Sequence, residues 1–298
     1  MTPRSRATLA AIGSILCWCW TGVCFAVGGR LAGPMAFLSL MCAAGVLTVV
    51  VVQLARRRPL VALAAIPPRV AVAGFFGVAL YTVMLAAAVG MADPRDLGQV
   101  NLLNYLWPVW IVVLSLGLLD ERPRVGLTLL GALTGFAGIA VARGFDRLLT
   151  PPASLLPHAL AGLGGLLFAL YCVLLRRWRV PEEQGGTAFH FTVCALMAAG
   201  IAAWRGEWAA WPGWSWPLLF WVLFGGVGPV GLGYLWWEIG MKRGDVRLIG
   251  QLAYFIPIGS SVLVGLFFAE TLSAGLAAGA VLIATGAWVV RRAGIPVE

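Results

Sequence analysis

The sequence predicts an all-α membrane protein with ten transmembrane helices, arranged as two inverted five-helix repeats. Three observations lead to this fold class. First, 61% of the 298 residues are hydrophobic and only 11% are charged, whereas a soluble domain carries about 25% charged residues. Second, apolar segments long enough to cross a bilayer fill nearly the whole chain. Third, a patterned segment of the chain recurs at an offset of 149 residues.

A helix needs about 20 apolar residues to cross the hydrocarbon core of a bilayer. The first candidate segment follows Arg4 and Arg6, as a signal peptide would. Its length of about 21 residues, together with Trp18 and Trp20, favours a helix that is retained. The ten predicted spans, joined by short connections, are 7–28, 33–55, 69–90, 97–119, 124–143, 155–176, 186–204, 216–240, 246–268 and 273–291.

The fourth and ninth spans share a pattern. The stretch LNYLWPVWIVVLSLGLLDE (Leu103–Glu121) is matched by LAYFIPIGSSVLVGLFFAE (Leu252–Glu270), with Leu, Tyr, Pro and Glu at the same places. A weaker match pairs Leu16-Cys17-Trp18 with Leu166-Leu167-Phe168. Because the offset covers five helices, an odd number, the two copies cross the membrane in opposite directions. Inverted repeats of this kind are typical of secondary transporters, whose substrate sites lie between the repeats.

The boundary between the repeats follows from this offset. We predict an N-terminal five-helix repeat over 1–147 and a C-terminal inverted repeat over 148–298, within one integral membrane domain. A transporter built in this way can be complete as a monomer.

The distribution of positive charge predicts the orientation. If the N-terminus lies in the cytoplasm, the inner connections hold 16 of the 21 Lys and Arg and the outer connections hold 5. Cytoplasmic loops carry such an excess, so both termini are expected in the cytoplasm. The net charge of +9 is therefore interpreted as a topology signal. No basic amphipathic surface indicates nucleic-acid binding.

A polar stripe marks the fourth span. At 100° per residue its members fall within about one third of the helix circumference, and a polar stripe in lipid should face protein or a water-filled cavity. Pro108 removes one backbone hydrogen bond near the middle of the span. An alternative is that the proline only shapes helix packing and the amides bond neighbouring helices. The stripe consists of Asn101, Asn104, Tyr105, Pro108, Val112 and Ser115.

The ninth span repeats this design. Tyr254, Pro257 and Ser261 share one face, and Gln251 lies near its entrance. Two helices interrupted at Pro108 and Pro257 would form opposite walls of one cavity and could take part in gating. Aromatic walls bind apolar or aromatic groups and can also hold a cation. The aromatic residues within predicted spans include Trp20, Tyr81, Trp107, Tyr171, Trp236 and Trp237.

The sequence gives only weak support for proton carriers within the spans. Glu238 is the only carboxylate well inside a predicted span, and His158 and His190 lie near the starts of spans. A carboxylate at the midplane is the usual proton relay, so facilitated exchange and proton antiport stay open. Glu121 and Glu270, which end their spans, are interpreted as structural. The six cysteines lie in apolar segments without zinc-site spacing, and no metal or cofactor is expected.

Other classes of function fit less well. The chain lacks the nucleophile–base pairs and metal motifs of an enzyme, so we expect no enzymatic activity. Sugar nucleotides would need buried Lys or Arg for their phosphates, and the single lysine is Lys242. The principal alternative to an amino-acid substrate is another small metabolite or a cationic drug-like compound.

Ten helices arranged as five plus five resemble the drug/metabolite transporter superfamily, EamA type. The resemblance rests on the paired Tyr-x-x-Pro helices that end in Glu121 and Glu270 and on the Trp20-Thr21-Gly22 region. The string Asn104-Tyr105-Leu106-Trp107-Pro108 is similar to the motif of the aromatic amino-acid exporters of that superfamily.

This resemblance implies a transporter in the bacterial inner membrane. It would export aromatic and other hydrophobic amino acids by alternating access through a central cavity. The cavity would be lined by helices 1, 3, 4, 6, 8 and 9. The implied substrate-binding residues are Trp20, Tyr81, Asn101, Tyr105, Trp107, Tyr171, Gln251 and Tyr254.

Overall fold

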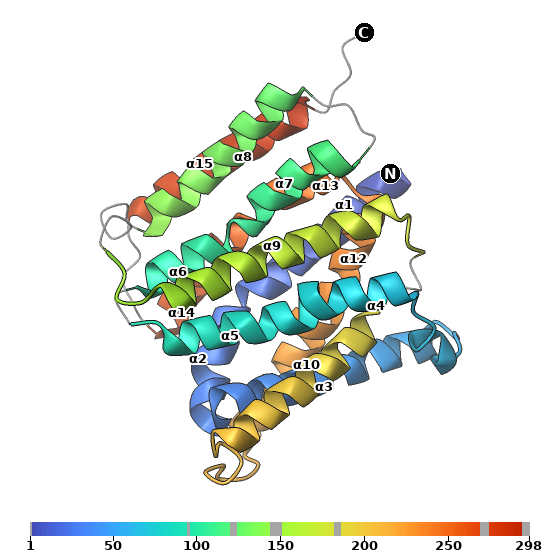
Figure 1. The fold of residues 1–298 in the computed structure, drawn as a ribbon, viewed down its shortest axis with the longest axis vertical. Helices are drawn as coiled ribbons and strands as arrows, with labels where there is room; N and C mark the ends of the chain where they lie inside the picture. The colour runs from blue at the N-terminus through green and yellow to red at the C-terminus, as the bar shows by residue number, and fades with distance from the viewer. Residues whose placement is uncertain are drawn as a thin grey trace.

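A computed structural model describes residues 2–93, 96–119, 124–143, 151–181, 186–268 and 274–293 (Figure 1). Within these ranges the regular structure is entirely helical, and ten helical stretches are long and apolar enough to cross a membrane. The predicted fold class is therefore confirmed. Span ends differ from the predicted ones by a few residues, the first beginning at Pro3. Glu121, Glu270 and the proposed repeat boundary at 147/148 lie outside the described residues.

Each half of the chain contributes five spans. In the first half they are α1 (Pro3–Cys19) with α2 (Thr21–Ala32), α3 (Pro34–Ala55), α4 (Pro68–Gly74) with η2 (Phe75–Leu80) and α5 (Tyr81–Met91), α6 (Leu97–Asn104) with α7 (Trp107–Leu118), and α8 (Val125–Arg143). In the second half they are α9 (Leu155–Arg177), α10 (Thr187–Trp204), α11 (Trp216–Gly225) with η5 (Gly226–Leu232) and α12 (Gly233–Arg243), α13 (Val246–Leu252) with α14 (Phe255–Phe268), and α15 (Ala274–Ala293). A short 3₁₀ turn, η1 (Leu60–Leu63), follows α3.

Irregular turns recur at matching places in the two halves. The third and eighth spans each contain a π-helical segment, η2 and η5, and such segments are rare and short in α-helices. The fourth and ninth spans each break once, at Tyr105–Leu106 and at Ala253–Tyr254. Both breaks lie just before a proline, which cannot donate the backbone hydrogen bond that would continue the helix. The two halves thus share the positions of their π-helical segments and helix breaks as well as the number of spans.

Two aspartates show the inversion of the halves. Asp96 precedes α6, and its Oδ2 accepts a hydrogen bond of 2.8 Å from the Ala153 N–H, just ahead of α9. Asp245 precedes α13, and its Oδ2 lies 3.0 Å from the Arg4 guanidinium at the start of α1. Asp245 lies 149 residues after Asp96, and Ala153 lies 149 residues after Arg4. The two contacts lie at opposite ends of the bundle, as inverted repeats require.

Two pairs of equivalent spans pack directly on each other. α8 packs along α15 and α3 along α10, and Figure 1 shows these pairs on opposite sides of the remaining spans. Glycines allow the backbones of α8 and α15 to approach. A Cβ built on Gly138 would lie 2.7 Å from the Gly279 carbonyl oxygen, and one on Gly131 would lie 2.7 Å from that of Gly286.

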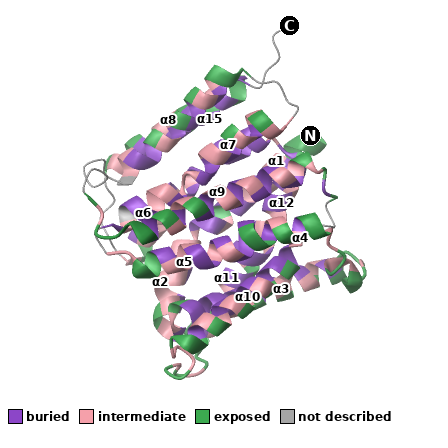
Figure 2. Cartoon of the chain, viewed as in Figure 1, coloured by how far each residue is buried: buried purple, intermediate pink, exposed green. Residues whose placement is uncertain are grey.

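The outer faces of the bundle are apolar. In Figure 2, exposed residues alternate with buried ones along α8 and α15. Large side chains such as Leu47, Leu133, Leu196 and Leu266 are more than half exposed. Such surfaces suit contact with lipid, since the hydrocarbon core cannot satisfy polar groups. The protein is therefore a multi-pass membrane protein.

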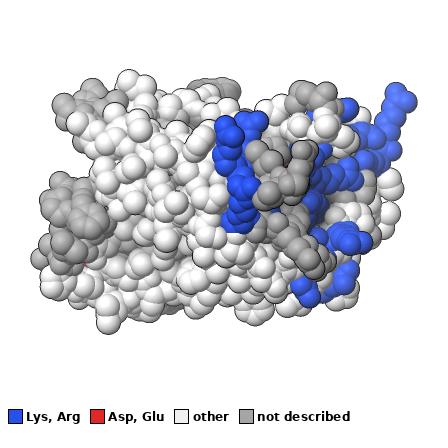
Figure 3. Space-filling view, turned by 90° about the horizontal axis from the view of Figure 1, so that it is seen from above, with Lys and Arg blue, Asp and Glu red and all other residues white. Residues whose placement is uncertain are grey.

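The basic residues gather at one end of the bundle. On the face shown in Figure 3, Lys and Arg lie toward that end and leave the other end largely free of charge. Direct contacts place several of them together: Arg4 with Asp245, and Arg176 with the Lys242 carbonyl. The Arg30 guanidinium, by contrast, lies over the Phe268 ring, at the end of the first span that is opposite Arg4. We call the end that carries Arg4 and Lys242 the basic end.

Candidate functional site

Aromatic side chains from six spans meet in the middle of the bundle. They come from α1, α5, α7, α9, α10 and α12, which belong to both halves. All except Tyr234 are at most 9% exposed. We call this group the central aromatic cluster. Its members are Trp18, Tyr81, Trp107, Phe168, Phe191, Tyr234 and Trp237.

Phe168 is the centre of this cluster. Its ring stacks on Tyr81 at a centroid distance of 5.0 Å and meets Trp107 edge-on at 5.1 Å. Trp237 lies 6.1 Å away and Trp18 6.3 Å away. These are the offset and edge-to-face arrangements that aromatic rings prefer. Because Trp18 belongs to the first half of the chain and Phe168 to the second, their contact lies where the two halves meet.

The N–H groups of two cluster residues are already bonded. The Trp18 indole N–H donates to the carbonyl of Pro229 at 2.9 Å, and Pro229 lies in the π-helical segment η5. The Trp237 indole donates to the Cys172 sulfur at 3.2 Å. These two indoles therefore present ring faces and edges to anything that enters the cluster. Such a surface suits an aromatic ring or an apolar side chain, and a cation can lie over the same faces.

The residues proposed from the sequence are distributed over several places. Tyr81 and Trp107 belong to the central aromatic cluster, and Tyr105 is half-buried against the apolar core of the bundle. Trp20 packs against Phe224 at 5.4 Å, away from the cluster. The Asn101 amide donates to the Leu97 carbonyl of its own helix at 2.8 Å.

Gln251 and Tyr254 point toward the pair α8 and α15. The Gln251 amide packs against the glycine positions Gly135 and Gly286, and the Tyr254 ring also contacts Gly135. Both side chains are fully buried, and their polar atoms have no hydrogen-bond partner among the described residues. The structure thus brings these two together beside α8, at a distance from the central aromatic cluster.

A second group, which we call the inner network, lies toward the basic end. Glu238 Oε1 accepts hydrogen bonds from the Tyr171 hydroxyl at 3.0 Å and the Thr187 hydroxyl at 2.6 Å. Glu238 Oε2 lies 3.2 Å from the Lys242 ammonium, which also donates to the Pro181 carbonyl at 3.1 Å. The Glu238 and Lys242 side chains are 6% and 3% exposed. A buried ion pair needs such additional hydrogen bonds to compensate for its lost hydration.

The two candidate histidines differ in surroundings. His190 is fully buried beside the Tyr171 ring, and its nitrogens have no hydrogen-bond partner among the described residues. His158 lies at the other end of the bundle, where its ring nitrogens contact the Ser154 carbonyl at 2.8 Å and the Gln99 amide oxygen at 3.1 Å. His158 therefore ties α9 to α6, and it does not reach the inner network.

The halves approach each other closely at the basic end. There α13 packs on α7, and a Cβ on Gly250 would lie 3.3 Å from Ile111. Within the second half, the Tyr171–Glu238 bond joins α9 to α12 at this end. The equivalent pair at the other end, α6 and α14, has no comparable backbone approach in the described parts of the chain. The direct contact between the fourth and ninth spans is therefore concentrated at the basic end.

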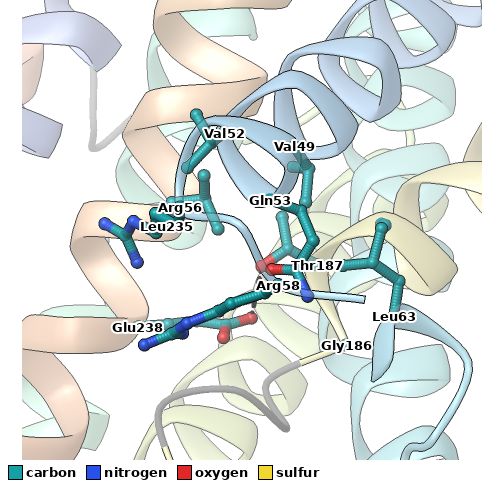
Figure 4. A pocket seen from close by; sticks show the side chains of 11 residues that line it. Val49, Val52, Gln53, Arg56, Arg58, Leu63, Gly186, Thr187, Leu235 and Glu238 are labelled. Atoms are coloured by element: carbon teal, nitrogen blue, oxygen red, sulfur yellow. Dashed lines mark hydrogen bonds between the residues drawn. The ribbon is translucent and has the colours of Figure 1, made fainter. Parts of the chain in front are cut away.

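A cavity opens at the basic end beside the inner network (Figure 4). It has a volume of about 50 Å³ and is lined by residues from α3, α10, α12 and the segment after α3. Glu238 and Thr187 contribute polar groups to one wall, while Gln53, Arg56 and Arg58 come from the end of α3 and the residues after it. A space of this size holds a few water molecules or a small polar group.

Trp18, Phe168, Phe191 and Tyr234 were not predicted as members of the central aromatic cluster. A signal for two of them was present, since the weaker match of the repeat pairs Trp18 with Phe168. Lys242 and Thr187 were not predicted as partners of Glu238. Lys242 follows Glu238 by four residues, the spacing that places two side chains on one helix face.

Comparison with known proteins identifies relatives along the whole chain. The model of the EamA-like transporter family matches residues 5–144 and 155–292. An aromatic amino acid exporter, YddG, from Ancylobacter novellus is 33% identical over 96% of this chain and 97% of that protein. YddG from Escherichia coli is 25% identical over 98% of this chain and 99% of its own. A crystal structure of a protein 32% identical in sequence superposes with a TM-score of 0.84, covering 96% of this chain and 98% of the other.

Proposed function

Because this chain belongs to the EamA-like transporter family, we propose that it exports aromatic and other hydrophobic amino acids across the bacterial inner membrane. Transport proceeds by alternating access, and the two inverted halves exchange roles at the two membrane faces. The relatives named as aromatic amino acid exporters cover nearly all of this chain. These names and the geometry of the bundle support the same substrate class.

One observation carries the choice of substrate. The central aromatic cluster lies between spans of both halves, at the place where inverted-repeat transporters bind their substrates. Its rings supply stacking and edge contacts, and the indole N–H groups of Trp18 and Trp237 already have hydrogen-bond partners. We assign the substrate side chain to this cluster, with Tyr81, Trp107 and Phe168 as its main contacts.

The remaining proposed residues have different roles in this assignment. Trp20, Asn101 and Tyr105 lie in the spans that border the route between the cluster and the end opposite the basic end. Tyr171 belongs to the inner network, where its hydroxyl donates to Glu238. Gln251 and Tyr254 support the ninth span against α8. We place the basic end and both termini in the cytoplasm, because 16 of the 21 Lys and Arg belong to that side.

Counterflow in proteoliposomes tests this function. Vesicles loaded with unlabelled phenylalanine should take up labelled phenylalanine or tryptophan, and vesicles without protein should not. Unlabelled aromatic amino acids should compete, whereas adenine and phenyltrimethylammonium should not. The same assay with and without a pH gradient distinguishes facilitated exchange from proton antiport. Uptake that only the quaternary ammonium compound inhibits would replace the amino acid with a cationic substrate.

The prolines at the two helix breaks allow a test of alternating access. Replacing both Pro108 and Pro257 with alanine restores two backbone donors and should straighten the fourth and ninth spans. We expect the exchange rate of labelled phenylalanine to fall severalfold, with little change in the concentration that half-saturates binding. Pro217, exposed in the first turn of α11, provides the control. Unchanged exchange in the double variant would contradict a role of the breaks in the transport cycle.

A further inference from the structure

We propose that the cavity at the basic end is an entry site for the zwitterionic head group of the substrate, with Glu238 as the acceptor of its α-ammonium group. This inference rests on the proposed function, because it assumes an amino acid as the substrate. It assigns a second subsite, separate from the central aromatic cluster that receives the side chain.

The lining of the cavity combines both signs of charge. Glu238 and Thr187 contribute a carboxylate and a hydroxyl from α12 and α10, and Arg56 and Arg58 contribute guanidinium groups from the residues that follow α3. In Figure 4 the Glu238 carboxylate and the side chain of Arg58 point into the same space. A carboxylate can hold an ammonium group and a guanidinium can hold a carboxylate. A free amino acid carries these two groups on one carbon, so the cavity fits its head group in one orientation.

The depth of Glu238 favours a role in recognition. Its residue is only 5% exposed, so the carboxylate is poorly hydrated, and a charge in this position interacts strongly with its neighbours. Its bonds come from an ammonium group, a phenol and an aliphatic hydroxyl. The ammonium group of a substrate can make the same bonds as the Lys242 ammonium, and it can therefore replace a donor of the inner network.

The position of the inner network links binding of the substrate ammonium group at Glu238 to opening of the bundle at the basic end. The Tyr171–Glu238 bond joins α9 to α12 at the basic end, and residue 237, next to Glu238, belongs to the central aromatic cluster. A substrate that takes over Glu238 from Tyr171 removes a contact between these spans. The inner network thus forms the barrier between the entry site and the cluster, and the ammonium group is the part of the substrate that weakens it.

Analogues of phenylalanine test the subsite in the wild-type protein. Phenethylamine lacks the carboxylate and 3-phenylpropionate lacks the ammonium group, while both keep the ring. In competition with labelled phenylalanine, we expect unlabelled phenylalanine to be the best inhibitor and phenylpropionate to be at least about tenfold weaker, the loss typical of a bond to a charged group. Equal inhibition by phenylalanine and phenylpropionate would overturn the proposal.

Variants assign the effect to Glu238. Glu238→Gln alone leaves the Lys242 charge buried without its partner, which can unfold a protein. The informative variant is therefore Glu238→Gln with Lys242→Met, which removes both charges. We expect its KM for phenylalanine to rise about tenfold and the preference for phenylalanine over phenylpropionate to disappear. Arg243→Gln, at an exposed position of the same helix, should change neither value.

The role of Arg56 and Arg58 in holding the substrate carboxylate is measured separately. Arg56→Gln with Arg58→Gln should raise the KM for phenylalanine and leave the inhibition by phenethylamine unchanged. An unchanged KM and unchanged analogue preference in the Glu238 and Lys242 double variant would overturn the proposal while wild-type uptake still supports the exporter. Absence of saturable uptake by the wild type would overturn the proposed function, and this assignment with it.

Discussion

Replacement of Phe168 by alanine is expected to lower the transport of labelled phenylalanine by at least about tenfold. The Phe168 ring is 2% exposed and contacts five aromatic rings of the central cluster. Its removal leaves a cavity, and a Phe→Ala change of this kind costs about 3–5 kcal/mol of stability in protein cores. It also removes the ring that both halves of the molecule share. Initial rates of counterflow in proteoliposomes measure the effect.

A second variant distinguishes lost transport from lost folding. Phe168→Leu keeps most of the apolar volume but has no ring, so its thermal stability in detergent should stay close to that of the wild type. Its transport rate should still fall severalfold. Phe220→Ala, at a position that is 55% exposed, should have little effect on either measurement. Normal transport by folded Phe168→Leu and Phe168→Ala proteins would remove the cluster from the transport route.

The largest effect on folding is expected at the contact of α8 and α15. Gly138→Val adds a side chain where a Cβ alone would lie 2.7 Å from the Gly279 carbonyl oxygen. Because the obstacle is backbone, the two helices must separate, and overpacking of this kind costs about 1–3 kcal/mol or more. We expect a clear drop in the melting temperature in detergent, measured by the loss of the monodisperse peak in size-exclusion chromatography.

Gly126 provides the matched control for this substitution. It lies on the same helix, and a Cβ there would have no other atom within 4 Å. The Gly126→Val protein should therefore have the same melting temperature as the wild type. Equal melting temperatures for the Gly138 and Gly126 variants would mean that the contact between α8 and α15 does not determine the stability of the bundle.

Almost all of the fold could be predicted from the sequence, for a physical reason. A helix that crosses lipid must be long and apolar, and it must satisfy its backbone internally. Composition and segment length therefore determine the number of spans, and the matching prolines at 108 and 257 reveal the repeat. The π-helical segment η2 could not be predicted, because FFGVAL reads as an ordinary apolar helix. In GVGPVGL, Pro229 predicts a disturbed helix but does not specify a π-helical turn.

The site could be predicted only in part. Tyr81 and Trp107 were identified as aromatic residues within predicted spans and through the resemblance to the aromatic amino-acid exporters. The direction of a side chain is harder to infer in a helix whose faces are all apolar, and Trp18 and Phe168 were missed for this reason. Gln251 illustrates the opposite problem. A polar residue in a span can face a cavity or fill a gap between helices, and the glycines Gly135 and Gly286 create such a gap.

The pairing of α8 with α15 has a consequence for the origin of the chain. The Gly138–Gly279 contact, shifted by 148 residues in each direction, becomes the Gly286–Gly131 contact, which is also present. An interface whose contacts map onto one another when its two sides are exchanged is typical of two identical subunits. The same bundle could therefore assemble from two antiparallel copies of one five-helix protein. Such a protein would have to insert in both orientations, and fusion into one chain lets each half carry its own charge bias and insert in only one.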